Sequence, residues 1–197
     1  MSDVSSEDAA WVTIETPLSP NQLQSFIEDL ERLFRINSLL EFERWESVAD
    51  DRVSFEAVNL SNGKHVKAEL SVKHIDRGLR INYDQLLKSS TSIQVESSMS
   101  SGSSLTITDD YSGTEETERR QRLDEVDRSL EQWGRDLHGY LQLWHRWSWL
   151  PPWRWYMQRI WQPMKPSARR ITRWIIWITF AEMAVVLLLI AILVIEQ

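Results

Sequence analysis

Apolar and polar positions alternate in short segments over the first 110 residues, which is the pattern of half-buried strands. Residues 11–16 place Val12 and Ile14 on one face and Thr13 and Glu15 on the other. Six later segments alternate in the same way between turn signals, at 41–48, 52–59, 65–73, 79–84, 91–97 and 103–109. The Asn-Gly pair of "SNGK" predicts a hairpin. One apolar face per segment predicts a meandering antiparallel sheet over a single core.

Two regions instead repeat apolar side chains at three and four residues, as amphipathic helices do. With Ser19 as N-cap and Pro20 at the first position, a helix is predicted through about Phe34, followed by a helical turn at 36–40. A long helix is predicted before Pro151-Pro152, with the stripe Leu123, Val126, Leu130, Trp133, Leu137, Tyr140 and Trp144. Gly134 and Gly139 interrupt it, which indicates either close approach of the sheet or a ligand, or a local irregularity.

The C-terminal run "WIIWITFAEMAVVLLLIAILVI", residues 174–195, contains a single ionisable side chain, Glu182. About 20 apolar residues cross a bilayer as a helix, so this run predicts one transmembrane span. Basic residues precede it, which by the positive-inside rule places the domain in the cytoplasm, and we expect a bacterial inner membrane. Two residues follow it, which predicts a tail-anchored protein. Glu182 is either a protonated side chain on a lone helix or a polar contact with a partner membrane helix.

Charge and tryptophan divide the chain into two parts. Residues 1–132 carry 14 basic and 26 acidic side chains, whereas residues 133–197 carry 8 and 3 and hold nine of the eleven tryptophans. An acidic domain argues against nucleic acid as a partner. Cysteine is absent, which excludes disulfides and thiol chemistry. We expect a disordered terminus at 1–9 without a signal peptide, one domain at 10–150, and a juxtamembrane segment at 151–173 before the span at 174–195.

The juxtamembrane segment places apolar and aromatic side chains on one face and Arg154, Gln158 and Gln162 on the other. This pattern is typical of a helix in the headgroup plane. The predicted membrane-interface residues are Trp153, Trp155, Trp161, Arg169, Arg170 and Arg173.

The order strand, two helices, six strands, long helix resembles the START-like or SRPBCC family, which includes polyketide cyclases, coenzyme Q-binding proteins and lipid-transfer domains. The stretch "SPNQLQSFIEDLERLFRINSLLEFERWE" is similar to the family's opening, with Asp29, Arg32 and Asn37 in its D-x-x-R-like segment and Asn-bearing turn. Ser38 stands where that family often has proline. Over residues 10–145 the resemblance implies an α+β helix-grip fold, in which an antiparallel sheet wraps around the C-terminal helix and encloses an apolar cavity.

Motifs for phosphate, dinucleotide or metal chemistry are missing, and the four histidines, His65, His74, His138 and His145, have no ligand spacing that favours a metal. No catalytic residue, metal or cofactor is therefore predicted. The expected cavity lining comprises the inward positions Val53, Phe55, Val66, Leu70, Leu79, Ile81, Tyr83, Leu130, Trp133 and Leu137.

These patterns predict a membrane-anchored cytoplasmic domain that binds a hydrophobic ligand, such as a lipid or an isoprenoid quinone. Membrane lipids are the expected partners of its anchor. One alternative is an accessory or assembly subunit that docks onto a membrane-protein partner through the span. Another is an enzyme of the cyclase or aromatase type, which would need polar residues converging in the cavity.

Overall fold

A seven-stranded antiparallel sheet dominates the computed structural model, which describes residues 9–84, 86, 88–98, 102–113 and 116–195, without the side chains of 116–128 and 193. The strand order is β1-β7-β6-β5-β4-β3-β2. The strands are β1 (Ala9–Thr16), β2 (Leu40–Ala49), β3 (Arg52–Asn59), β4 (Lys64–Ile75), β5 (Gly78–Asp84), β6 (Ser90–Ser97) and β7 (Ser103–Asp110). All seven predicted strands are confirmed. The expected disorder at 1–9 lies outside the described residues except at Ala9, which pairs with Asp110.

The β3–β4 hairpin turns at the predicted Asn-Gly pair. Gly63 adopts a φ of 70°, a left-handed conformation that glycine enters without a steric cost. Its backbone N–H donates to the Asn59 carbonyl oxygen at 2.7 Å and closes the turn. The alternating pattern of β3 and β4 is thereby held in register, with Phe55 opposite Ala68.

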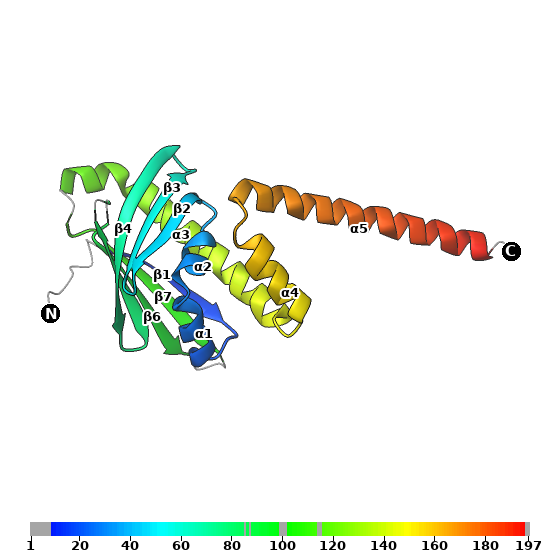
Figure 1. Ribbon diagram of the computed structural model, residues 1–197, viewed down its shortest axis with the longest axis horizontal. Helices are drawn as coiled ribbons and strands as arrows, with labels where there is room; N and C mark the ends of the chain where they lie inside the picture. The colour runs from blue at the N-terminus through cyan, green and yellow to red at the C-terminus, as the bar shows by residue number, and fades with distance from the viewer. Residues whose placement is uncertain (1–8, 85, 87, 99–101, 114–115, 196–197) are drawn as a thin grey trace.

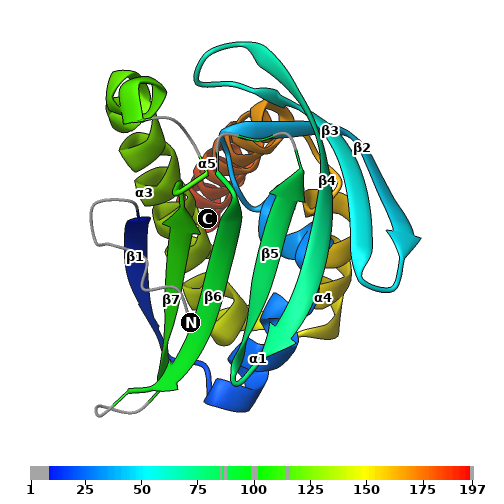
Figure 2. The same cartoon turned by 90° about the vertical axis from the view of Figure 1, so that its left-hand side faces the viewer.

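Two short helices, α1 (Pro20–Ile27) and α2 (Leu30–Arg35), connect β1 to β2 at the opposite edge of the sheet (Figure 2). The Ser19 side chain accepts from the Gln22 backbone N–H, and the Gln22 side chain accepts from that of Ser19, which is a capping box. The single helix predicted through Phe34 is wrong, because Asp29 caps a new helix by accepting from the Arg32 backbone N–H at 3.1 Å. The helical turn expected at 36–40 is also wrong, since β2 begins at Leu40.

The long helix α3 (Glu116–Trp147) lies across one face of the sheet (Figures 1 and 2). Gly134 lets it approach β1 closely, since an added Cβ would lie 2.8 Å from Cγ2 of Val12. The helix runs through Gly134 without a break, which supports close approach of the sheet over a local irregularity. Gly139 has a different environment, because a Cβ there would meet no atom of the described chain within 4 Å.

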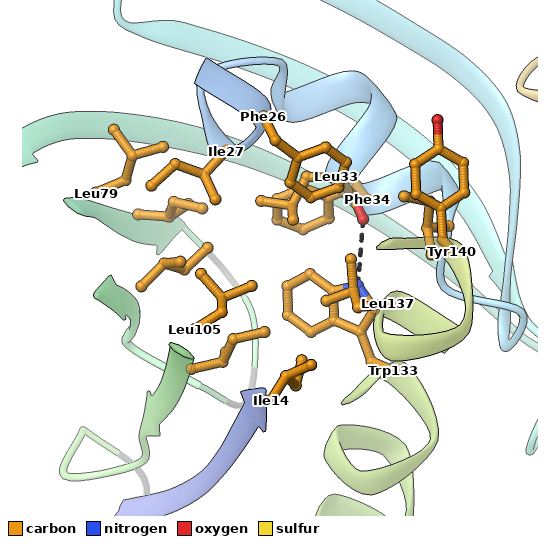
Figure 3. Close-up of a cluster of buried hydrophobic side chains, with 14 of the residues drawn as sticks. Ile14, Phe26, Ile27, Leu33, Phe34, Leu79, Leu105, Trp133, Leu137 and Tyr140 are labelled. Carbon is orange, nitrogen blue, oxygen red and sulfur yellow. Dashed lines mark hydrogen bonds between the residues drawn. The ribbon is translucent and has the colours of Figure 1, made fainter. Parts of the chain in front are cut away.

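The core fills the space between the sheet, α3 and the helix pair (Figure 3). Trp133 lies at its centre, with its ring centroid 5.5 Å from that of Phe34. Its indole N–H donates to the Leu33 carbonyl oxygen at 3.2 Å, so its polar atom is satisfied. Leu137 of α3 and Leu105 of β7 enter this core from opposite sides, and both are completely buried. These contacts fix the distance between helix and sheet.

The chain after α3 packs back onto the domain through α4 (Pro151–Tyr156) and the single π-helical turn η1 (Met157–Trp161). Met157 is 3% exposed. The Trp161 ring lies 5.4 Å from the Tyr140 ring, and Trp153 also packs against the core. The apolar face predicted to lie in the headgroup plane is therefore largely used within the protein. Trp155, by contrast, is 59% exposed.

Arg169, predicted to be a membrane-interface cation, also makes contacts within the protein. Its guanidinium donates to the carbonyl oxygens of Arg35, Trp161 and Gln162 at 2.6, 3.1 and 2.8 Å. It also lies 4.0 Å from the centroid of the Trp161 ring. These contacts tie the start of the last helix to α2 and η1, whereas Arg170 and Arg173 remain exposed.

The last helix, α5 (Pro166–Ile195), extends away from the domain (Figure 1). Its residues 166–192 are long and apolar enough to cross a membrane, and its most apolar stretch has no part buried in the domain. A core helix of similar composition would be covered by protein. Glu182 lies within this exposed helix.

Mutation can distinguish the tryptophans that pack against the core from those that remain exposed. We expect Trp161→Ser to lower the free energy of unfolding of the domain by about 2 kcal/mol, because a half-buried aromatic side chain is removed from the core. Trp155→Ser should change it by less than about 0.5 kcal/mol, as exposed substitutions do. Urea unfolding of the full chain in detergent, followed by near-UV circular dichroism, measures both. Equal losses would show that Trp155 also belongs to the core.

Candidate functional site

A cavity of about 380 Å³ lies between the sheet, α2 and α3. Apolar side chains form part of its wall, including Phe34, Phe55 and Trp133. Residues of the β3–β4 hairpin border it, among them the exposed Lys64. The volume falls within the roughly 300–1,000 Å³ that small-molecule sites occupy. The complete lining is Phe34, Asn37, Leu39, Leu40, Phe55, Asn59, Asn62, Lys64, His65, Val66, Lys67, Tyr83, Leu86, Lys88, Asp109, Tyr111, Ser129 and Trp133.

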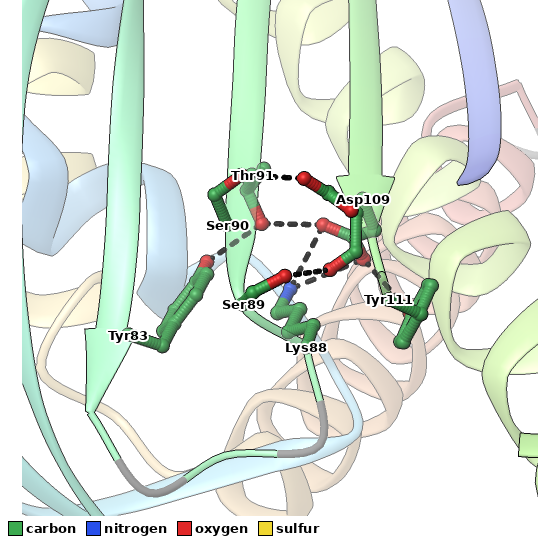
Figure 4. Close-up of polar contacts among 8 residues, drawn as sticks. Tyr83, Lys88, Ser89, Ser90, Thr91, Asp109 and Tyr111 are labelled. Atoms are coloured by element: carbon green, nitrogen blue, oxygen red, sulfur yellow. Dashed lines mark hydrogen bonds and ion pairs between the residues drawn. The ribbon is translucent and has the colours of Figure 1, made fainter. Parts of the chain in front are cut away.

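A buried polar cluster forms one part of this wall (Figure 4). The Lys88 ammonium donates to both carboxylate oxygens of Asp109, each at 3.1 Å. The Tyr111 hydroxyl donates to the same carboxylate at 3.3 Å, and the Thr91 hydroxyl donates to its Oδ1. The Tyr83 hydroxyl is hydrogen-bonded to Thr91 Oγ1 at 2.8 Å. The Asp109 carboxylate is therefore occupied by donors from Lys88, Thr91 and Tyr111.

Strand alternation explains why these side chains meet. On β7, Leu105, Ile107 and Asp109 share the inward face, and Tyr111 continues that spacing just beyond the strand. Asp110 points to the other face, where Arg80 lies 3.8 Å away. Lys88 comes from the connection between β5 and β6, and its side chain is 21% exposed against 4% for Asp109. The cluster thus joins three neighbouring strands at one end of the cavity.

The cluster holds its protons firmly. Burial is the largest influence and lowers the pKa of Lys88, but Asp109, Tyr83 and Tyr111 together more than offset it, so the pKa of the ammonium is raised. Burial raises the pKa of Tyr83, and burial together with the Asp109 charge raises that of Tyr111. At neutral pH the cluster therefore contains an ammonium and two neutral phenols, and the phenols donate within the cluster to Thr91 and Asp109.

Four of the ten predicted cavity residues line the cavity: Phe55, Val66, Tyr83 and Trp133. The others belong to the packed core beside it, namely Val53, Leu70, Leu79, Ile81, Leu130 and Leu137. All ten side chains are buried except Val66, which is half-buried. Periodicity places a side chain on a face but does not show which part of that face remains unfilled.

Sequence reasoning missed the polar members of the cavity, Lys88, Asp109 and Tyr111. The alternation of Leu105 and Ile107 extends to Asp109 and Tyr111, and this signal could have identified a carboxylate on the inward face. Lys88 lies outside any strand, so no periodic pattern marks it. The enzyme alternative required converging polar groups in the cavity, and this cluster supplies them.

The predicted absence of a metal site remains a prediction. The residues described include no group of three or more His, Asp and Glu side chains that could hold a metal ion. His65 borders the cavity, with its Nδ1 3.8 Å from a carboxylate oxygen of Glu43.

The cavity lies next to the start of the apolar helix. Leu39 and Leu40 line the cavity, and the following residue, Glu41, accepts a hydrogen bond from the Lys165 ammonium at 2.7 Å. Lys165 immediately precedes α5. The strand β2 thus forms part of the cavity wall and also contacts the residue that precedes α5.

Several solved structures share this fold. A START superfamily protein from Mycobacterium smegmatis matches 68% of this chain and 97% of its own length, with 14% identity and a TM-score of 0.53. A protein from Thermus thermophilus matches 68% and 95%, with 18% identity and a TM-score of 0.51. The di-domain ARO/CYC protein StfQ of the steffimycin biosynthetic pathway matches 70% of this chain and 51% of its own, with 11% identity and a TM-score of 0.50.

No family model matches the sequence, and a search of curated proteins finds no match. The structural similarity, at these identities, establishes the fold: the predicted α+β helix-grip architecture is confirmed.

Proposed function

We propose that this protein is a membrane-anchored helix-grip domain that binds an apolar ligand bearing an oxygen acceptor at one end. The cavity carries the proposal, since it combines aromatic and aliphatic walls with a buried donor cluster. Small-molecule sites characteristically pair apolar walls with a few placed polar groups.

The donor cluster supports an oxygen acceptor as the polar end of the ligand. An ammonium has three N–H donors, and two contacts to Asp109 leave at least one for a ligand. Asp109 already balances the charge of Lys88, so a neutral carbonyl or hydroxyl oxygen fits better than a second carboxylate. Lys88 also lies 4.8 Å from the Tyr83 ring and 5.6 Å from the Trp133 ring, which hold its ammonium at the cavity wall.

The exposed apolar helix supports a membrane source for this ligand. With α5 in a bilayer, the Glu41–Lys165 ion pair would lie where β2, a strand that borders the cavity, meets the start of the helix. Apolar molecules such as lipids and isoprenoid quinones concentrate in that bilayer. The basic residues before the span support a cytoplasmic position for the domain under the positive-inside rule.

Purification of the full chain in mild detergent, followed by organic extraction and mass spectrometry, tests this function. We expect an apolar molecule with a carbonyl or hydroxyl oxygen at about one per chain. Purified protein without any such molecule would contradict the proposal. A stoichiometric membrane protein in place of the small molecule would favour an accessory subunit docked through α5 and Glu182.

The second candidate is an enzyme that uses the Lys88 cluster on a carbonyl ligand. The observation in its favour is the convergence of Lys88, Tyr83 and Tyr111 at the cavity, and one structural neighbour is an ARO/CYC protein. The Tyr83 and Tyr111 hydroxyls already donate to Thr91 and Asp109, so the Lys88 ammonium is the group that would polarise a carbonyl, and its raised pKa disfavours removal of a proton. Recovery of the extracted ligand unchanged after incubation with fresh protein would argue against catalysis.

A further inference from the structure

A second hollow of about 450 Å³ lies outside the cavity, between the end of α3, η1 and the first turns of α5. We call it the juxtamembrane groove. Four arginines line it, Arg135, Arg169, Arg170 and Arg173. Among its lining residues the only acid is Asp136, which accepts from the Ser38 backbone N–H at 2.8 Å and from the Gln132 amide at 3.0 Å. The groove is therefore positively charged.

Two of these arginines are available to a ligand. Arg135 is paired with Glu131 at 3.3 Å, and Arg169 is bound to three backbone carbonyls. The side chains of Arg170 and Arg173 are exposed and make no hydrogen bond or ion pair with any described residue. They are three residues apart on α5 and so share one face of the helix. A pair of unpaired guanidinium groups in one hollow suits a phosphate group.

The groove changes from cationic to apolar along α5. Ile176 and Trp177 line it one turn beyond Arg173, in the direction of the apolar span. Phospholipids have the same order, with phosphate, ester linkages and acyl chains at increasing depth. A soluble phosphate would make no use of the apolar end.

Buried polar atoms at the groove give an independent indication of a ligand. The Tyr140 hydroxyl and the Trp153 indole N–H are buried without a hydrogen-bond acceptor among the residues described, and both side chains line the groove. The Arg32 guanidinium beside the Tyr140 hydroxyl is itself only a donor. Tyr140 is 4% exposed. Buried donors without acceptors are costly and uncommon in folded proteins. An ester or phosphate oxygen in the groove would supply an acceptor.

Gly139 keeps this space open. It lines the groove, and a Cβ at that position would meet no described atom within 4 Å. In a helix interior glycine is disfavoured by ~1 kcal/mol relative to alanine, so the open space has a cost in helix stability. From these observations we propose that the juxtamembrane groove binds the headgroup of one anionic phospholipid, with Arg170 and Arg173 at its phosphate.

The test uses the full chain in nanodiscs of equal parts phosphatidylglycerol and phosphatidylcholine, with native mass spectrometry of the lipids retained after release. The native protein should retain phosphatidylglycerol preferentially. The double variant Arg170→Gln/Arg173→Gln should lower that preference by about tenfold or more, because each cation near an anionic headgroup contributes roughly a factor of five. An unchanged preference would overturn the proposal.

The double variant Arg154→Gln/Arg159→Gln is the matched control. Both arginines are exposed on the same juxtamembrane segment but do not line the groove. This control should retain the native preference for phosphatidylglycerol. An equal loss of preference would show that lipid retention depends on general attraction to the basic surface, and it would overturn the proposed site. Displacement of phosphatidylglycerol by excess inorganic phosphate would likewise overturn a lipid as the ligand.

A variant that alters no charge gives a second test. Gly139→Leu should fill the groove and abolish selective retention while leaving the melting temperature unchanged or higher, since leucine favours the helix. His138→Leu, one residue away and outside the groove, should retain the lipid. Retention by Gly139→Leu would contradict the proposal. Failure here would leave the cavity function untouched, because these residues do not line the cavity; the two proposals share only the premise that α5 enters a bilayer.

Discussion

Replacing Lys88 with methionine is expected to destabilise the domain by about 3 kcal/mol or more. The substitution keeps the length and apolar contacts of the side chain but leaves the Asp109 carboxylate, 4% exposed, without its cation. Loss of one partner of a buried ion pair is costly because the remaining charge stays desolvated. Urea unfolding of the full chain in detergent, followed by near-UV circular dichroism, measures this loss.

A double-mutant cycle identifies the pair as the cause. Lys88→Met/Asp109→Leu should be clearly more stable than the sum of the two single losses predicts, because neither charge remains buried. Lys73→Met is the control, since this exposed lysine of β4 should contribute less than about 0.5 kcal/mol. Additive losses in the cycle would show that Lys88 and Asp109 do not interact in the folded protein.

The same pair predicts a pH dependence. The pKa of Lys88 is raised above its ordinary value of 10.5, so the folded state binds this proton more tightly than the unfolded state. The resulting stability is complete below pH 10.5 and is lost as the pH rises through the folded pKa. We expect the difference between native protein and Lys88→Met to stay constant from about pH 7 to 9 and to shrink only in more alkaline solution. A difference that already disappears near about pH 8 would contradict the raised pKa.

Filling the cavity is expected to abolish ligand retention. Val66 is half-buried on β4 and lines the cavity, so Val66→Trp places a large ring in the ligand space. Overpacking typically costs about 1–3 kcal/mol, which a variant at this partly exposed position should tolerate. The extracted ligand per chain should fall by about tenfold or more, since a ring in the ligand space removes most of the apolar contact area.

Glu69→Trp is the matched control for this substitution. It adds the same side chain to the same strand, but Glu69 is exposed on the other face of the sheet. Ligand retention should be unchanged in this variant. Equal loss in both would attribute the effect to general damage to the sheet, and retention by Val66→Trp would place the ligand elsewhere.

The local alternation of apolar and polar residues was sufficient to predict the strands of the sheet, because each strand has one buried and one solvated face. Val53, Phe55 and Ala57 alternate with polar neighbours in the sequence, and all three are buried in β3. The helix pair was less predictable. The apolar stripe from Leu23 to Phe34 continues across the break, and only the capping role of Asp29 shows that two helices are present.

The candidate sites depended on contacts between distant segments. Lys88 and Asp109 are 21 residues apart and meet because β6 and β7 pair. Trp161 has the sequence context of a membrane-interface residue, yet its ring packs on Tyr140. An aromatic face suits a bilayer surface and a protein surface equally well, so composition could not distinguish them. The geometry of the chain after Pro151-Pro152 decides between these roles.

An experimental structure of the full chain purified in mild detergent tests the central claim most directly. It should contain elongated density between the sheet and α3, with one end within hydrogen-bond distance of the Lys88 ammonium and the rest against Phe55 and Trp133. A cavity that holds only water, or side chains that close it, would contradict the account.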